Sequence, residues 1–464
     1  MYSALLRNVF LPAVLRRDDR QSAIKHWRFF QKSQFWSRQR LLDYQFEQMK
    51  IMLAHAYHTT KYYRNVFDER GLTPESFKSL DDLALLPIMT RDLQFRHLSD
   101  MISSQYAPET LMRFETGGTT GQRATLYRNF ESNNIKIGGA WRFESWMGRL
   151  PCDKMGLVWP ASMDFLEQLD WKQRIKQRYF LRQVMLFAGT HRESDLDICY
   201  REMRRFNPRF LKVFPTALFS LAEYIESTHL PSFHLDGILS TGEPLYGYQR
   251  KRFSELFGCD IIDMYGSRET GNTAGECPAH EGLHISMETV LLEFVENGRP
   301  VPTGQRGRIL ITDLTNFGVP VIRYQIDDYG KLLQSSCSCG RGLTLMSAAV
   351  GRVSDDIIAP DGQRVTGNVI GNHLTSAGPE VGQLQVVQKS PSEFVVRVTN
   401  RPPVTQEHFD YITGVMTRII SKDINIKFEV VERIEPEKSG KVRFVVSHLA
   451  PMREESDADE DGDQ

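Results

Sequence analysis

The fold is decided by residues 237–269, which read GILSTGEPLYGYQRKRFSELFGCDIIDMYGSRE. Two short apolar runs, Gly237–Ser240 and Ile261–Tyr265, flank a segment of helical character that ends at Phe257. A helix between two such runs predicts parallel strands joined by a crossover. Ligands of parallel sheets bind at the loops that leave the carboxyl ends of the strands. Residues 240–244 and 265–269 are therefore candidate site loops.

The same alternation runs from about residue 150 to residue 329, with further strands expected at 155–159 and 211–214. It predicts an α/β fold, in which a large N-terminal domain, residues 1–350, has mixed, mainly parallel sheets covered by helices. A helical segment at 20–100 belongs to this domain. Within it, one face of a helix over 38–57 is expected to face the core through Leu42, Phe46, Met49, Leu53 and Ala56.

The pattern changes after Gly351. Pro360-Asp361-Gly362 between two short apolar runs predicts a hairpin. Strands at 384–387, 394–398, 424–430 and 444–446 and a helix near 406–420 complete a small, mobile α+β domain over 351–450. Residues 451–464 form a tail that we expect to be disordered, because the last eleven residues of the chain include seven acids.

Composition excludes several classes of protein. The 464 residues include 57 basic and 58 acidic side chains, and residues 1–453 carry a net charge of +6. This small excess does not indicate nucleic-acid binding. No run approaches the roughly 20 apolar residues of a membrane-spanning helix, and Arg16 and Arg17 stand where a signal peptide would be cleaved. The sequence predicts a cytoplasmic protein whose six cysteines are too few for a disulfide framework.

A glycine-rich loop, Thr116-Gly-Gly-Thr-Thr-Gly-Gln122, lies between two short apolar segments. Glycines allow close approach of the backbone and threonines add hydroxyl donors, which suits a loop that wraps phosphate oxygens. The loop lacks the Gly-Lys-Ser/Thr ending of a Walker P-loop, so that class of nucleotide site is excluded.

Five motifs follow this loop in a characteristic order: Ser240-Thr-Gly-Glu-Pro244, Tyr265-Gly-Ser-Arg-Glu269, Arg323-Tyr-Gln-Ile-Asp-Asp328, Gly351-Arg352 with Asp355, and Ser439-Gly-Lys441. Together they resemble the AMP-forming adenylate-forming superfamily, and within it the CapK-like branch of the phenylacetate-CoA ligase family. The resemblance extends from about residue 25 to residue 448.

The resemblance implies a site for ATP. The loop that would hold the β- and γ-phosphates consists of Thr116, Gly117, Gly118, Thr119, Thr120 and Gly121. The residues that would surround adenine are Ser240, Thr241, Gly242, Glu243, Pro244, Tyr265, Gly266 and Ser267, with Tyr265 and Gly266 stacking on the base.

The resemblance also implies which charged residues bind Mg²⁺, the ribose and the phosphates. Glu269 would hold Mg²⁺, because a hard cation that bridges phosphates prefers carboxylate oxygen. Asp328 would accept both ribose hydroxyls, and Arg323 and Arg352 would lie near the ribose and phosphate. Lys441 would neutralise charge as the carboxylate attacks the α-phosphate, and Asp355 would be the hinge of the C-terminal domain.

Two departures separate this chain from the family pattern. Ile326-Asp327 replaces Thr-Gly before Asp328, and Arg123 replaces a proline that many relatives have after the phosphate loop. Glycine gives a turn more freedom than aspartate does, so Asp327 is an alternative ribose ligand.

Three cysteines and a histidine form a second group. Cys277, His284, Cys337 and Cys339 supply three thiolates and one imidazole, a complete tetrahedral zinc set without an open position. His280 is an alternative fourth ligand, and His284 is favoured because Gly282-Leu-His284 resembles a segment of the family. This zinc would be structural and would join loops within 277–339.

These features predict an ATP-dependent, AMP-forming ligase that activates a carboxylic acid and transfers the acyl group to CoA or to a sugar or amine acceptor. The CapK-like resemblance suggests a role in surface-polysaccharide assembly, and an oligomer is possible for such a protein. A nucleotide-binding accessory protein without turnover is the alternative, supported by the replacement at Ile326-Asp327.

Overall fold

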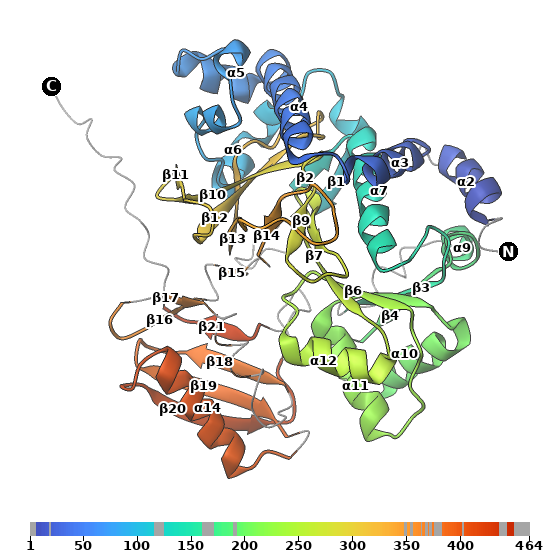
Figure 1. Ribbon diagram of the computed structural model, residues 1–464, viewed down its shortest axis with the longest axis vertical. Helices are drawn as coiled ribbons and strands as arrows, with labels where there is room; N and C mark the ends of the chain where they lie inside the picture. Colours follow the sequence, from blue (N-terminus) through green and yellow to red (C-terminus); the bar gives the residue numbers. More distant parts are fainter. Residues whose placement is uncertain are drawn as a thin grey trace. The chain divides into compact units, whose positions relative to one another are not determined.

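The computed structural model describes residues 6–17, 20–115, 125–159, 171–188, 193–347, 350–352, 356–362, 364–366, 370, 374, 383–400, 403–435 and 443–449. The chain divides into two compact units whose boundary lies between Val350 and Gly351. Each unit is described by itself (Figure 1).

Helices dominate the start of the first unit. They are η1 (Leu6–Phe10), α2 (Leu11–Arg17), α3 (Ser22–Ser33), α4 (Arg38–Thr59), α5 (Lys61–Glu69) and α6 (Arg91–Met101), with short 3₁₀ turns η2 (Pro74–Ser76), η3 (Asp81–Leu85) and η4 (Pro108–Thr110). Helix α4 begins after Ser37, whose side chain accepts a hydrogen bond from the backbone N–H of Arg40. The expected helix is confirmed, and Met49, Leu53 and Ala56 are buried as predicted. In its first two turns Leu41 and Gln45 are buried instead of Leu42 and Phe46, which are only partly covered.

An eight-stranded sheet forms the centre of this unit. Its order is β14-β9-β8-β7-β6-β5-β3-β4, and the strands are β3 (Met155–Trp159), β4 (Gln183–Phe187), β5 (Phe210–Val213), β6 (Gly237–Thr241), β7 (Ile261–Ser267), β8 (Gly271–Glu276), β9 (Leu283–Ile285) and β14 (Leu345–Met346). Strands β3 to β7 pair in parallel, and β8, β9 and β14 extend the sheet antiparallel.

Helices cover both faces of the sheet. Neighbouring residues of β6 show the two faces: Ile238 packs with α10 (Glu193–Phe206), α11 (Pro215–Ser227) and α12 (Gly247–Phe257), and Leu239 packs with residues of α7 (Phe130–Trp146). Alternation along a strand produces this division. Figure 1 shows α10, α11 and α12 grouped beside β3–β6. Two further helical segments, α9 (Trp171–Ile175) and η5 (Lys176–Leu181), precede β4.

A five-stranded sheet and a small hairpin complete the first unit. The sheet has the order β11-β10-β12-β13-β15, with β10 (Val290–Glu296), β11 (Arg299–Pro300), β12 (Gly307–Asp313), β13 (Tyr324–Gly330) and β15 (Val350–Arg352), the last of which begins in the first unit and continues into the second. Its neighbours β10, β12 and β13 run antiparallel. Strands β1 (Met112–Glu115) and β2 (Thr125–Arg128) form the hairpin whose connection is the glycine-rich loop.

The second unit contains the elements expected after residue 351. Strands β16 (Asp356–Ile358) and β17 (Arg364–Thr366) form the predicted hairpin around Pro360-Asp361-Gly362. A four-stranded sheet has the order β20-β19-β18-β21, with β18 (Leu384–Gln388), β19 (Glu393–Thr399), β20 (Asn425–Val431) and β21 (Val445–Ser447), and helix α14 spans Gln406–Ile419. The predicted α/β fold with a smaller C-terminal α+β domain is confirmed.

Candidate functional site

The two candidate loops lie next to one another. Strands β6 and β7 are parallel neighbours, with Thr241 paired to Met264 near their carboxyl ends. The segment Gly242–Pro244 follows β6 directly, and Tyr265, Gly266 and Ser267 are the last residues of β7. The structure therefore brings together the two motifs that the sequence places 20 or more residues apart, at the edge where parallel sheets bind ligands.

A tyrosine and an aspartate from different sheets meet at this edge. The hydroxyl of Tyr265 donates a hydrogen bond to Oδ2 of Asp328 at 2.8 Å. Strand β13 has an irregular register here, because Leu310 pairs with Gln325 and Arg308 pairs with Tyr329. Three residues of β13, 326–328, thus oppose one residue of β12, and bulges of this kind redirect side chains beside functional sites.

Gly242 needs to be glycine for two reasons. Its φ is +81°, a region that side chains with a Cβ rarely occupy. A Cβ built on it would also lie 2.6 Å from the ring of Phe214. The backbone of this loop thus packs closely against Phe214, the residue that precedes helix α11.

Substituting Gly242 by Ala is expected to lower the free energy of unfolding by about 2 kcal/mol, from strain and overpacking together. Gly247→Ala is the matched control, because nothing lies within 4 Å of its added Cβ. Urea denaturation of both variants measures the difference. Equal stability of the two would contradict the assigned close packing.

The remaining residues of the first loop have contacts within the fold. Oε2 of Glu243 accepts hydrogen bonds from the backbone N–H of Thr216 at 3.1 Å and from its hydroxyl at 2.7 Å, and so caps the start of α11. The hydroxyl of Ser240, which is fully buried, donates to Asp263 at 3.0 Å. Burial, together with the charge of Glu276, raises the pKa of Asp263 to about 7. Ser240 and Glu243 therefore stabilise the loop through hydrogen bonds to other parts of the fold.

The turn between β7 and β8 carries Glu269. A Cβ on Gly266 would come within 2.5 Å of the carbonyl oxygen of Gly271, so glycine allows the two strands to approach. The hydroxyl of Ser267 accepts from the backbone N–H of Thr270 at 3.2 Å and closes the turn. Glu269 lies in this turn and is partly exposed, so its carboxylate can reach a ligand.

Two basic residues hold this turn in place, and the sequence did not identify either. Nη2 of Arg128, on β2, donates to the carbonyl of Arg268 at 2.9 Å and connects the hairpin of the glycine-rich loop to the turn. Nζ of Lys136, on α7, donates to the carbonyl of Thr270 at 2.6 Å and to Asp313 at 2.7 Å. Burial lowers the pKa of Lys136 to about 8, against the opposing effect of Asp313.

Arg323 makes contacts within the fold. Its guanidinium is 3% exposed and pairs with Glu293, with Nε 3.1 Å and Nη2 3.0 Å from Oε1 of that residue. Nη1 donates to the carbonyls of Ala84 and Leu86. These contacts of the guanidinium join the N-terminal helical segment to the five-stranded sheet. These contacts stabilise the fold, and the contact of Arg323 with ribose and phosphate stays a prediction.

The structure gathers the four predicted metal ligands. The ligand atoms of Cys277, His284, Cys337 and Cys339 all lie within 4.8 Å of one another. Sγ of Cys277 is 3.6 Å from Sγ of Cys337, and Sγ of Cys339 is 3.4 Å from Nε2 of His284. A tetrahedral zinc ion with Zn–S bonds of about 2.3 Å places its sulfur ligands about 3.8 Å apart. The cluster fits such an ion.

Histidine 280 belongs to a different network. Its ring lies 3.0 Å from Asp260 and 3.1 Å from Glu276. His284, in contrast, is fully buried beside Trp146, and burial lowers its pKa to about 4, so the imidazole is neutral and able to ligate. Ser338 donates from its backbone N–H to Glu281 at 2.9 Å, which fastens the turn of Cys337 and Cys339 to the loop before His284.

Comparisons with known proteins show what this chain is similar to. The family model of the CapK C-terminal domain matches residues 357–448. The phenylacetate-coenzyme A ligase of Escherichia coli (strain K12) is 27% identical over 341 residues, 69% of this chain and 73% of that protein. Protein CapK of Staphylococcus aureus is 21% identical over 400 residues, 84% of this chain and 85% of that protein. This chain is similar in sequence to the phenylacetate-CoA ligases and to CapK.

The fold of this chain is also similar to that of a solved CoA ligase. The crystal structure of 2-hydroxyisobutyryl-CoA ligase in the postadenylation state, in complex with R3-HIB-AMP, aligns with a TM-score of 0.70 at 18% identity, and covers 87% of this chain and 88% of its own. The resemblance stated from the sequence motifs is therefore confirmed.

Several of the predicted site residues stay predictions. The glycine-rich loop from Thr116 to Gly121, the hinge Asp355 and the catalytic Lys441 lie outside the described residues, and so do the side chains of Asp327 and Arg352. Among the described helices, none has the length and apolar character to cross a bilayer.

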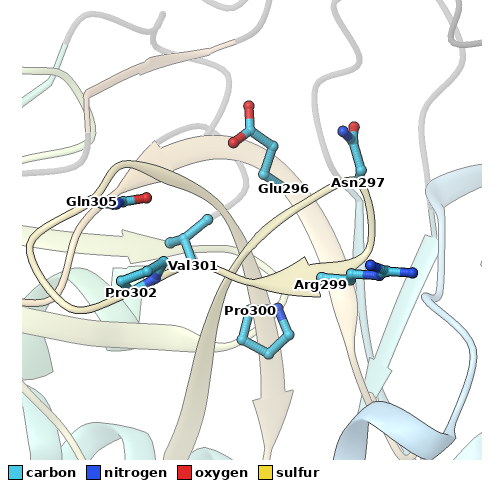
Figure 2. Close-up of a pocket in the computed structure, with 7 residues that line it drawn as sticks. All are labelled: Glu296, Asn297, Arg299, Pro300, Val301, Pro302 and Gln305. Carbon is cyan, nitrogen blue, oxygen red and sulfur yellow. The ribbon is translucent and has the colours of Figure 1, made fainter.

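An open pocket of about 440 Å³ lies away from the predicted residues. Figure 2 shows that it is formed by the β10–β11 hairpin and the loop after it, and it is lined by Glu296, Asn297, Arg299, Pro300, Val301, Pro302 and Gln305. None of the predicted site residues lines it, and its single carboxylate offers no chemistry of acid activation. The carboxyl ends of β6 and β7, within the eight-stranded sheet, remain the candidate site.

Proposed function

We propose that this protein is an ATP-dependent, AMP-forming ligase that activates a carboxylic acid as an acyl-adenylate and transfers the acyl group to CoA or another acceptor. The observation that carries the proposal is the hydrogen bond between Tyr265 and Asp328 at 2.8 Å. An aromatic ring suits the face of a purine, and an adjacent carboxylate suits the two hydroxyls of a ribose. The similarity to phenylacetate-CoA ligases supports the same reading.

The other residues of the site have roles that follow from charge. Mg²⁺ would neutralise the phosphates, and Glu269, partly exposed at its turn, would hold it. Arg128 and Lys136 fix the backbone on either side of Glu269, which preorganises the turn. The glycine-rich loop would bind the β- and γ-phosphates, and Lys441 would stabilise charge that develops at the α-phosphate. These groups lower the barrier by position and charge, without a covalent enzyme intermediate.

The acceptor and the cellular setting belong to the same proposal. CoA is the acceptor named for the phenylacetate-CoA ligases, whereas the CapK relationship favours a sugar amine or hydroxyl in surface-polysaccharide assembly. The acid would be a small molecule, and the reaction would take place in the cytoplasm.

A zinc ion is proposed at Cys277, His284, Cys337 and Cys339. With four protein ligands it has no position for substrate, so its contribution is to stability.

The test is carboxylate-dependent exchange of labelled pyrophosphate into ATP, measured over a panel of aryl, fatty and amino acids. The proposal expects exchange with one class of acid, and adding CoA or an amino sugar afterwards identifies the acceptor. ATP binding without exchange across the whole panel would overturn the proposal and favour the accessory protein, the reading supported by Ile326-Asp327.

A further inference from the structure

Six large apolar side chains are exposed on neighbouring helical segments of the first unit. Two come from the η1–α2 segment and four from the α9–η5 segment; we call them the α2–α9 surface: Val9, Phe10, Trp171, Ile175, Tyr179 and Phe180. Trp171 is 67% exposed and Tyr179 is 58% exposed. Large exposed apolar groups are common singly, but a contiguous group indicates an interaction surface.

The two segments are packed together, so the surface is continuous. The rings of Phe10 and Phe180 lie 6.5 Å apart. Leu181, at the end of η5, packs against the cluster formed by Leu6, Leu11 and Leu15. Figure 1 shows α2 and α9 adjacent to one another. Leu6, Leu11 and Leu15 of the first segment are thus buried in a small core, and the second segment, which has no fully buried residue, packs against this core through Leu181.

The same segments carry only positive charge. Residues 6–17 and 171–182 contain eight lysines and arginines and no acid. Arg178 pairs with Glu202, and Arg7 pairs with Asp153. Arg16, Arg17 and Lys172 are exposed. The nearby acids of the sequence, Asp18, Asp19, Asp164, Glu167 and Asp170, lie outside the described residues.

A basic hollow adjoins this surface. A cavity of about 390 Å³ between α2 and α3 is lined by three basic residues, Arg16, Lys25 and Arg28, with Pro12, Gln21 and Ile24. Outside the hollow, burial and, to a smaller extent, the charge of Arg17 lower the pKa of Lys176, so a positive charge of the first segment acts on one of the second. Such a concentration of positive charge attracts anions.

We infer that the α2–α9 surface docks this protein on bilayers that contain anionic lipid. Trp, Tyr and Phe at a basic, partly apolar surface match the interface between head groups and acyl chains. Burial of the exposed Val9 and Ile175 in that environment is favourable. Neither side chain has a flat ring on which a nucleic-acid base stacks. The protein would lie on the membrane without crossing it, and this inference is independent of the proposed reaction.

The experiment is flotation of the full-length protein with vesicles of equal parts phosphatidylcholine and phosphatidylglycerol, compared with vesicles of phosphatidylcholine alone. The wild type is expected to float with the anionic vesicles and to be released as salt rises, because screening weakens exposed charges. Each basic residue near the surface contributes roughly fivefold in affinity. Arg17→Glu with Lys172→Glu should therefore reduce binding by at least about 25-fold.

Apolar variants test the second half of the inference. Phe10→Ser with Trp171→Ser should weaken vesicle binding at least about tenfold. Phe95→Ser, 60% exposed on α6, and Lys61→Glu, whose side chain is 73% exposed, are controls that make single substitutions of the same two kinds elsewhere on the unit. All these variants should keep the thermal midpoint of the wild type.

Three results would overturn the inference: no flotation with anionic vesicles, flotation that the control variants reduce as much as the surface variants do, or binding to a labelled oligonucleotide that the surface variants abolish while vesicle binding is unchanged. The last would assign the surface to nucleic acid. Pyrophosphate exchange by the surface variants should equal that of the wild type, which separates docking from catalysis.

Discussion

Replacing Glu269 by Gln is expected to lower the rate of pyrophosphate exchange by at least about a hundredfold, the usual cost of losing a preorganised charge interaction in a transition state. Glutamine keeps the size of the side chain and its hydrogen-bonding oxygen, but it lacks the charge that Mg²⁺ prefers. The backbone of the turn is held by hydrogen bonds from Arg128 and Lys136 to its carbonyls and by the hydroxyl of Ser267. The fold of the turn should therefore survive the substitution.

The dependence on Mg²⁺ separates a metal ligand from a structural residue. Exchange by Glu269→Gln should need more Mg²⁺ for half-maximal rate than exchange by the wild type. Glu255→Gln, whose side chain is 68% exposed on α12, is the matched control and should behave as the wild type. Lys441→Ala should also lower the rate of exchange, and its residual exchange should have the same Mg²⁺ requirement as that of the wild type. An identical Mg²⁺ profile for Glu269→Gln and the wild type would remove Glu269 from the metal site.

The local elements of the fold were predictable because each has its own pattern. The strand at 155–159 and the hairpin around Pro360-Asp361-Gly362 appear where the sequence places them. The adjacency of β6 and β7 follows from the crossover rule, and it brought Gly242 and Tyr265 to one edge without any knowledge of tertiary contacts.

Contacts between distant segments were not predictable. The bulge at 326–328 depends on how β13 meets β12, and no local pattern marks it. Arg323 was assigned from its motif, yet its partner Glu293 comes from another strand, β10. Lys136 lies in a helix whose polar and apolar residues occur on all sides, so periodicity gives no sign that this lysine is buried.

The metal cluster shows what spacing can and cannot decide. The sequence indicated three thiolate ligands and one imidazole ligand, but the spacing allowed either His280 or His284 to supply the imidazole. The structure separates them because His280 is engaged with Asp260, whereas His284 faces Cys339 at 3.4 Å.

Replacing Cys337 by Ser is expected to remove zinc from the protein and to lower its thermal midpoint by about 10 °C or more, since structural zinc contributes several kcal/mol to folding. The cluster joins β8 and β9 to the 337–339 turn, and Cys277 and Cys337 are both part of the core of the first unit. Loss of the ion would leave buried thiols and an imidazole without their common partner. Metal analysis of the purified variant, together with calorimetry, measures both effects.

Matched variants make this prediction specific. Cys259→Ser changes a thiol outside the cluster, and His280→Ala removes the imidazole that contacts Asp260 and Glu276. Both should retain one zinc per chain, whereas His284→Ala should lose it. A strong chelator should lower the midpoint of the wild type toward that of Cys337→Ser and leave the midpoint of Cys337→Ser unchanged. Wild-type protein that contains no zinc after growth with the metal, and that a chelator does not destabilise, would show instead that the four residues are buried free thiols and a core histidine.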